Sequence, residues 1–269
     1  MCKTTTQSNP TVADLSRKVY TACSKGGGGK TVFIRIFDEK RMMDLTSSFL
    51  DGEIFPELES FFNELDATDG IPQAAKEILK TYSFKVIYED RASTEAERQK
   101  FGVMDFPVYL ESTEGPTALT NSEAEELLES HKLPGLTYTF LIKLENGQEE
   151  LKHEPADVYG SLKAFLGDSS KIGIGIPGNF LDNDQTLCRK IAIVLIDRLI
   201  ANPDIALSIR RKMFVAILKH EIGHMFGLTH EQNTIMHGSY QVGPLITNPT
   251  YTNFQLKIIS LALTKLSNN

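Results

Sequence analysis

The chain has 269 residues, is 41% hydrophobic and carries a formal net charge of −7 at pH 7. This length and apolar content predict a full hydrophobic core, in one large or two small domains. The acidic balance, together with the lack of a basic run, disfavours nucleic acid and anionic membrane as partners and leaves a peptide or protein as the expected one.

The first 29 residues are predicted to be a flexible arm. They are polar and end in the four glycines Gly26–Gly29, a composition that is typical of a loose segment and a joint. The folded domain, with insertions, is therefore expected to cover residues 30–269.

A strand–helix–strand unit is predicted at the start of this domain. Residues 31–37 alternate as a strand, and residues 49–65 repeat as an amphipathic helix. A short helix over residues 73–80 then leads to a strand over residues 84–88. This order of elements predicts a parallel sheet.

The middle of the chain mixes strands with insertions. Strands are predicted over residues 106–110 and 138–144, with an acidic helical patch over residues 122–129. Residues 171–178 are extended and rich in glycine, which is typical of an edge strand whose backbone is approached closely. The apolar run 191–200 fits either a helix or a buried strand, and periodicity does not decide between them.

Two helices are predicted in the last third of the chain. The first is expected to be capped by Asp204 or Ser208 and to be closed by Gly227. The second, over residues 254–263, follows Asn253 and carries repeated apolar positions.

The first of these helices contains a metal-binding pattern, HEIGHMFGLTH. On a helix, His220 and His224 lie one turn apart and face the same way, with Glu221 beside them. Catalytic zinc takes three protein ligands and keeps a fourth position for water. Gly227 can adopt the left-handed conformation that turns the chain back, so that His230 supplies the third imidazole. The spacing predicts one Zn²⁺ per chain on three histidines.

A carboxylate ligand from further along the chain is the other common arrangement around such a histidine pair. After Glu231, however, the sequence contains no Asp or Glu. His237 is a further strong ligand downstream, but only His230 has the spacing that a helix followed by a glycine turn can deliver.

The segment His220–His230, followed by Thr234-Ile235-Met236, resembles the metzincin clan of zinc metalloproteases, whose motif ends in a Met-turn. Within the clan, residues 222–224 and 227–230 resemble the matrixins and the archaemetzincins. Glu231 stands where archaemetzincins have the cysteine that opens a second zinc site, which implies a single zinc here. The resemblance implies an α+β fold with a twisted mixed sheet, an active-site helix that ends at a glycine turn, and a C-terminal helix.

The resemblance also implies roles for residues outside the histidine motif. Met236 would form an apolar floor beneath the three imidazoles. A peptide substrate would bind along the glycine-bearing strand at Gly173, Ile174 and Gly175. Tyr240, four residues past Met236, would steady the oxyanion with its phenol.

The expected function is that of a zinc-dependent endopeptidase. Zinc would activate a water molecule, and Glu221 would act as the general base that takes its proton. Two other classes stay open: a zinc-binding recognition protein built on a peptidase fold, and a zinc amidase that acts on a non-peptide bond.

The remaining features bear on the compartment of the protein. Three cysteines are too few and too scattered for a disulfide framework. The N-terminus shows no apolar leader, and no stretch reaches the length of a membrane span. Cytoplasmic residence or export by a leaderless route is therefore expected, and the oligomeric state stays open.

Overall fold

A computed structural model of the chain describes residues 17–19, 30–38, 54–98, 101–111, 137–143, 149–155, 172–176, 190–200, 206–238 and 250–268. The strands are β1 (Arg17–Val19), β2 (Lys30–Phe37), β3 (Tyr82–Glu89), β4 (Asp105–Glu111), β5 (Thr137–Lys143), β6 (Glu149–Pro155), β7 (Gly173–Ile176) and β8 (Ile191–Leu195). The helices are α1 (Ile54–Asn63), the 3-10 helix η3 (Leu65–Ala67), α2 (Gln73–Leu79), α3 (Glu95–Arg98), α6 (Ile196–Ile200), α7 (Leu207–Met225) and α9 (Asn253–Asn268). The helical patch expected over 122–129 lies outside the described residues.

Six strands form one mixed sheet in the order β1-β3-β2-β4-β8-β7. The four inner strands run parallel to one another, whereas β1 and β7 pair antiparallel at the two edges. The parallel pairing of β2 with β3, which are joined through α1 and α2, confirms the strand–helix–strand prediction. Strands β5 and β6 form a separate antiparallel pair.

Strand β1 lies within the segment that was predicted to be a flexible arm. Its three residues pair with β3, with Arg17 opposite Glu89 and Val19 opposite Ile87. The first strand of the sheet therefore precedes residue 30, because the edge of β3 takes a partner from the arm. The rest of residues 1–29 lies outside the described part of the chain.

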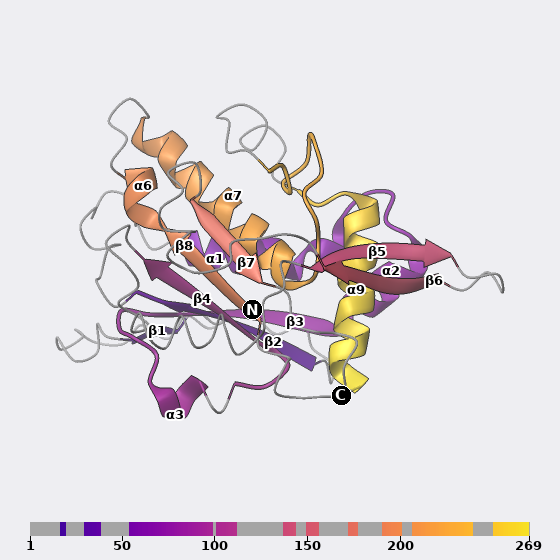
Figure 1. The fold of residues 1–269 in the computed structure, drawn as a ribbon, viewed down its shortest axis with the longest axis horizontal. Coiled ribbons are helices and arrows are strands. Elements are labelled where there is room, and N and C mark those ends of the chain that lie inside the picture. The colour runs from indigo at the N-terminus through magenta and orange to yellow at the C-terminus, as the bar shows by residue number, and fades with distance from the viewer. Residues whose placement is uncertain are drawn as a thin grey trace, which may run out of the picture.

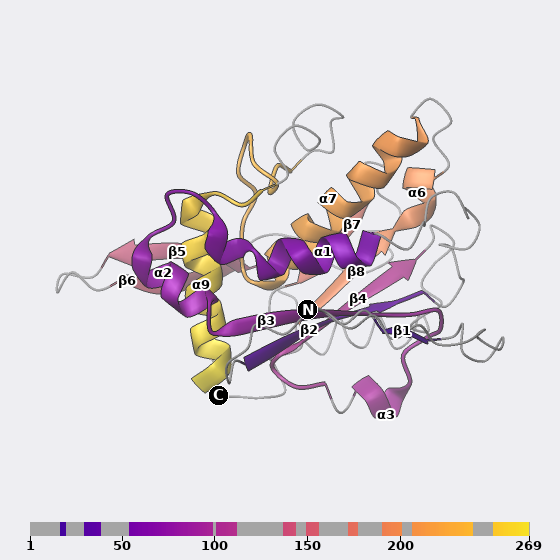
Figure 2. The same cartoon turned by 180° about the vertical axis from the view of Figure 1, so that it is seen from behind.

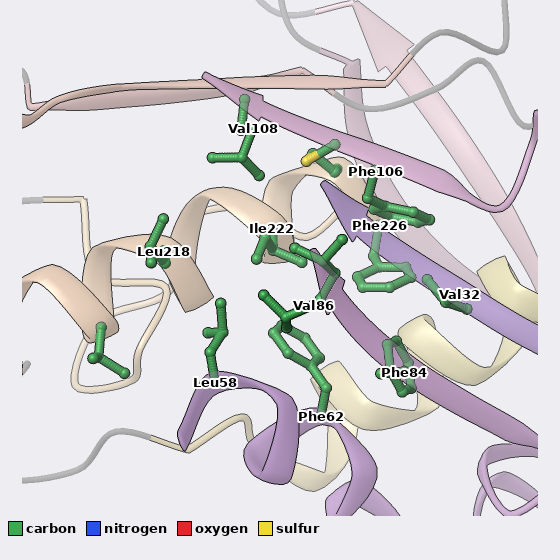
Figure 3. Close-up of a cluster of buried hydrophobic side chains, with 14 of the residues drawn as sticks. Val32, Leu58, Phe62, Phe84, Val86, Phe106, Val108, Leu218, Ile222 and Phe226 are labelled. Carbon is green, nitrogen blue, oxygen red and sulfur yellow. The ribbon is translucent and has the colours of Figure 1, made fainter. Parts of the chain in front are cut away.

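Helices α1 and α7 lie on the same side of the sheet, and α3 lies on the other side (Figures 1 and 2). Along β2, Val32 and Ile34 are fully buried while Phe33 between them is partly exposed, as expected for a strand with one covered face. Figure 3 shows the resulting core, to which the sheet contributes Val86 and Phe106, α1 contributes Leu58 and Phe62, and α7 contributes Leu218 and Ile222. This packing fixes α7 above the sheet.

The apolar run 191–200 contains both of the elements that it could have formed. Residues 191–195 are β8 and residues 196–200 are α6. All five residues of β8 are buried, because the strand lies between β4 and β7 inside the sheet. A strand that is buried on both faces shows no alternation, which is why periodicity could not separate it from a helix.

The helix that carries the histidines begins differently from the prediction and ends as predicted. Ala206 occupies the N-cap without a side-chain hydrogen bond, Ser208 lies inside the helix, and Asp204 is outside the described residues. Gly227 ends the helix with a φ of 88°. The mixed sheet, this helix and the C-terminal helix α9 confirm the expected α+β class.

No helix within the described ranges combines the length and the apolar content that a membrane crossing requires.

Candidate metal centre

A Schellman motif closes the last turn of α7. The amide of Gly227 donates to the carbonyl of His224 at 2.8 Å, and the amide of Leu228 donates to the carbonyl of Gly223 at 3.1 Å. With Gly227 in the left-handed conformation, the chain leaves the helix axis at this point. The chain then returns and places His230 beside His224, as the motif predicts.

Three histidines bring their Nε2 atoms together. His224 Nε2 lies 3.0 Å from His220 Nε2 and 3.2 Å from His230 Nε2. Around a tetrahedral zinc, ligand nitrogens at about 2.0–2.1 Å from the ion lie roughly 3.3 Å from one another, close to both separations. Among the described residues this is the one group of three that could hold a metal ion, and His237 is not part of it.

Backbone carbonyls set the tautomers of the two histidines on α7. His220 Nδ1 lies 2.8 Å from the carbonyl oxygen of Ile235, and His224 Nδ1 lies 2.7 Å from that of Leu228. A carbonyl oxygen only accepts, so each Nδ1 carries the proton and each Nε2 keeps its lone pair. Metal-binding imidazoles use this arrangement.

The electrostatics of the cluster fit a cation. Burial, and to a smaller extent the proximity of His230, lowers the pKa of His224 to about 3. Burial, followed by the proximity of His224, lowers the pKa of His220 well below its ordinary value. At neutral pH both imidazoles are therefore uncharged, and two lone pairs face each other across 3.0 Å with no proton between them. Such a contact is repulsive by itself and becomes favourable around a metal ion, so the donor set fits zinc.

Glu221 lies on α7 against the edge strand β7. A side-chain carbon added to Gly173 would lie 2.7 Å from Glu221 Cδ and 2.8 Å from its Cγ. A carbon added to Gly175 would lie 2.7 Å from His224 Cβ. Packed atoms do not approach so closely, so a larger residue at Gly173 would displace the Glu221 side chain, and one at Gly175 would displace the helix itself. Gly175 thus sets how closely the helix approaches the strand, and Gly173 leaves room for the Glu221 side chain.

The glycine-bearing segment therefore has a contact that the sequence did not foresee. It is the predicted edge strand, paired antiparallel with β8. The backbone of β7 is approached closely, as predicted, and the element that approaches it is α7. Helix α7 packs on the face of β7 on which a side chain at Gly173 or Gly175 would lie. Ile174, between them, points to the opposite face. The substrate contacts expected at Gly173, Ile174 and Gly175 stay a prediction.

The segment after the third histidine, residues 231–236, forms a compact turn that is called the Met loop below. The amide of Glu231 donates to the carbonyl of Met236 at 2.9 Å, and the amide of Met236 donates to Thr234 Oγ1 at 3.0 Å. Met236 is fully buried, and a side-chain carbon on Gly223 would lie 2.6 Å from its sulfur. Met236 thus packs directly on α7 as an apolar side chain.

Several contacts in and around the centre were not predicted from the sequence. Leu228 and Ile235 act through backbone carbonyls, which carry no side-chain signature. Thr252 and Gln255, at the start of α9, hydrogen-bond each other as a capping box, a pattern that the sequence does display as T-x-x-Q. Tyr240 lies outside the described residues, so its role stays a prediction.

No protein-family model matches this chain, and no curated protein matches it. A solved structure does: the crystal structure of archaemetzincin from Methanopyrus kandleri matches 90% of this chain and 99% of that chain, with 14% sequence identity and a TM-score of 0.37. Archaemetzincins are one of the two groups that the histidine motif resembles. A likeness of this size says nothing about substrate or reaction.

Proposed function

We propose that this chain is a zinc-dependent endopeptidase with a single metal centre at His220, His224 and His230. The observation that carries the proposal is the convergence of three Nε2 atoms, two of which keep their lone pairs because their rings donate from Nδ1 to carbonyls. A zinc ion bound there would supply Lewis acidity to a scissile carbonyl and lower the pKa of water toward neutrality.

Glu221 is the proposed general base. It is buried, it follows the first ligand on the same helix, and its carboxyl group rests against Gly173. In this role Glu221 takes a proton from the attacking water and returns it to the leaving amine. A carboxylate held in one position by its surroundings suits both proton transfers, because little reorganisation is then needed at the moment of reaction.

The outer edge of β7, which pairs with no other strand of the described residues, is the proposed site for the peptide backbone. Hydrogen-bonding groups of a strand point along the plane of the sheet, whereas the faces are occupied by side chains. The amide of Leu195 donates to the carbonyl of Ile172, so in this antiparallel register the backbone groups of Ile174 also face β8. The backbone groups of Gly173 and Gly175 face the outer edge, where an added strand would pair with them on either side of Ile174. Tyr240 remains the proposed oxyanion donor, which a Tyr240→Phe variant with lower turnover would support.

The experiment that tests this function is a cleavage profile of the full chain on a proteome-derived peptide library, with and without a chelator. We expect internal cleavage of peptides that stops when the metal is removed and returns when Zn²⁺ is added back. Metal analysis of the same preparation should give one zinc per chain.

Two other outcomes would each point to a different class. Zinc binding without cleavage of any peptide would favour a recognition protein, and cleavage confined to non-peptide amides would favour an amidase. A His230→Ala variant that keeps full zinc occupancy would contradict the assigned ligand set.

A further inference from the structure

We infer that Gln255 is a positioning residue for the metal centre, because its side chain joins the start of α9 to the Met loop, which directly follows His230. The inference rests on the metal centre proposed above. Gln255 is 2% exposed and lies in the first turn of α9, outside the histidine motif. In Figure 1 the segment that follows α7 comes back beside the start of α9.

The amide group of Gln255 is fully engaged. Its Oε1 accepts from the backbone amide of Thr252 at 3.0 Å, and its Nε2 donates to Glu231 Oε2 at 2.8 Å and to Thr234 Oγ1 at 3.2 Å. A backbone N–H can only donate, so it fixes Oε1 toward Thr252 and leaves Nε2 to face the Met loop. One side chain therefore caps α9 and holds two points of the Met loop.

Thr234 passes this restraint through the Met loop. Its hydroxyl donates to the carbonyl of Glu231 at 3.0 Å, while it accepts from the amide of Met236 at 3.0 Å and from Gln255. A hydroxyl has one donor and two acceptor positions, and all three are filled here. The position of Gln255 thus determines the position of both ends of the Met loop.

Two metal ligands depend on that loop. His230 directly precedes Glu231. The side chain of His230 is exposed, whereas the other two ligands are buried. Ile235, inside the loop, supplies the carbonyl that accepts from His220 Nδ1. A displacement of the Met loop would therefore move the third ligand and release the ring of the first. Loss of such supporting hydrogen bonds typically weakens metal binding by about 10- to 100-fold.

A helix cap alone could also explain why Gln255 is buried, and two variants separate the possibilities. Thr252→Ala removes the hydroxyl that accepts from the backbone amide of Gln255 at 3.2 Å, and it leaves the side-chain contacts of Gln255 with the Met loop in place. Gln255→Glu keeps an oxygen that accepts from the backbone amide of Thr252. It replaces the NH₂ group that donates to Glu231 with an oxygen, so two carboxylates then face each other. The first variant weakens the cap, and the second breaks the restraint on the loop.

The closing experiment measures zinc affinity of the full chain by competition with a chromophoric chelator. We expect Gln255→Glu to weaken zinc binding by about 10-fold or more, and Thr252→Ala to lower the melting temperature with zinc affinity unchanged. The exchanged pair, Glu231→Gln with Gln255→Glu, restores the hydrogen bond between residues 231 and 255 with donor and acceptor reversed, but not the one to Thr234, so it should recover part of the affinity. Recovery of this kind would not follow from a capping role.

A variant without an added buried charge keeps the test decisive if Gln255→Glu does not fold. Glu231→Ala removes an exposed side chain and the 2.8 Å contact, and we expect it to weaken zinc binding several-fold. Unchanged zinc affinity in Glu231→Ala and in any folded Gln255→Glu would overturn the positioning role and leave the proposed function intact. An unsubstituted chain that binds no zinc would instead overturn the proposed function.

Discussion

The proposed metal centre has two halves that are built in different ways. The helix half, with His220, Glu221 and His224, lies on one continuous element, so the spacing of four residues alone brings the two rings to one side. The loop half, from His230 to Met236, has no regular element of its own and is held by hydrogen bonds to α7 and α9. Local geometry defines the first half, and long-range contacts define the second.

The difference teaches where each half is sensitive. The helix half lies between β7 and the core, so it responds to changes in packing volume. The loop half is exposed at His230 and responds to the loss of single hydrogen bonds. Changes in the packing around Glu221 should therefore act mainly on turnover, and the loss of a hydrogen bond in the loop half should act mainly on zinc affinity.

The largest expected effect comes from Glu221→Ala. We expect turnover to fall by about 10²–10⁴-fold, because the water loses its proton acceptor and the amine its donor. Zinc affinity should hold, since Glu221 is not among the three ligands, and alanine is a good helix former. Zinc content, melting temperature and peptide turnover measured on one preparation test this, with the exposed Glu77→Ala as a matched control. An inactive variant that has also lost zinc would assign Glu221 to metal binding.

The second prediction concerns the contact of β7 with the helix half. Gly173→Ala places a carbon against the Glu221 carboxyl group, and a displacement of about 1 Å at a reacting group can cost about 10²-fold in rate. Turnover should fall far more than zinc affinity. Gly102→Ala is the matched control, because its added carbon would meet its nearest neighbour, Asp105, at an ordinary 3.6 Å. An equal loss of zinc affinity would mean that β7 holds the whole helix half and not the carboxyl group alone.

The third prediction addresses the point where the two halves join. Gly227 has a φ of 88°, and an alanine there is expected to cost about 1–2 kcal/mol in the free energy of unfolding. For a chain of this size that corresponds to a fall of roughly 2–8 °C in melting temperature. Calorimetry on the zinc-free protein measures it, again against Gly102→Ala. No change in stability would show that the turn tolerates a side chain and that the join is not strained.

The smallest expected effect is a pH dependence of the stability of the fold that does not involve the metal centre. Burial of Glu59, on α1, raises its pKa from 4.5 to about 7, opposed by the Val86 amide and Lys85. The folded state then binds more protons than the unfolded state between those values, so stability falls as pH rises from about 4.5 to 7. Glu59→Gln can still accept from the Val86 amide, which donates to Glu59 Oε2 at 2.6 Å, and carries no charge.

We therefore expect Glu59→Gln to gain melting temperature over the unsubstituted chain at pH 8 and to lose that advantage toward pH 5. Zinc affinity at pH 8 should be the same in both, because α1 supplies no ligand. The surface variant Glu77→Gln serves as the control. A constant difference in melting temperature from pH 5 to pH 8 would contradict the titration of Glu59.

The sequence by itself determined those elements, and those parts of the histidine cluster, that depend on neighbours along the chain. The positions of His220 and His224 follow from the helical repeat, and the turn toward His230 follows from Gly227, because only glycine adopts its backbone conformation without strain. The parallel pairing of β2 and β3 followed from the order strand, helix, strand. These rules act within a few residues or within one supersecondary unit, so they can be read without the fold.

Only the tertiary structure decided what surrounds that set. The split of residues 191–200 into β8 and α6 depends on burial of the strand on both faces. The neighbour of Gly173 and Gly175 is α7, which sequence spacing does not encode. The carbonyls of Leu228 and Ile235 belong to the backbone, which every residue shares, and Gln255 meets Glu231 from 24 residues away. Such contacts arise when distant elements pack together, and no local pattern in the chain specifies them.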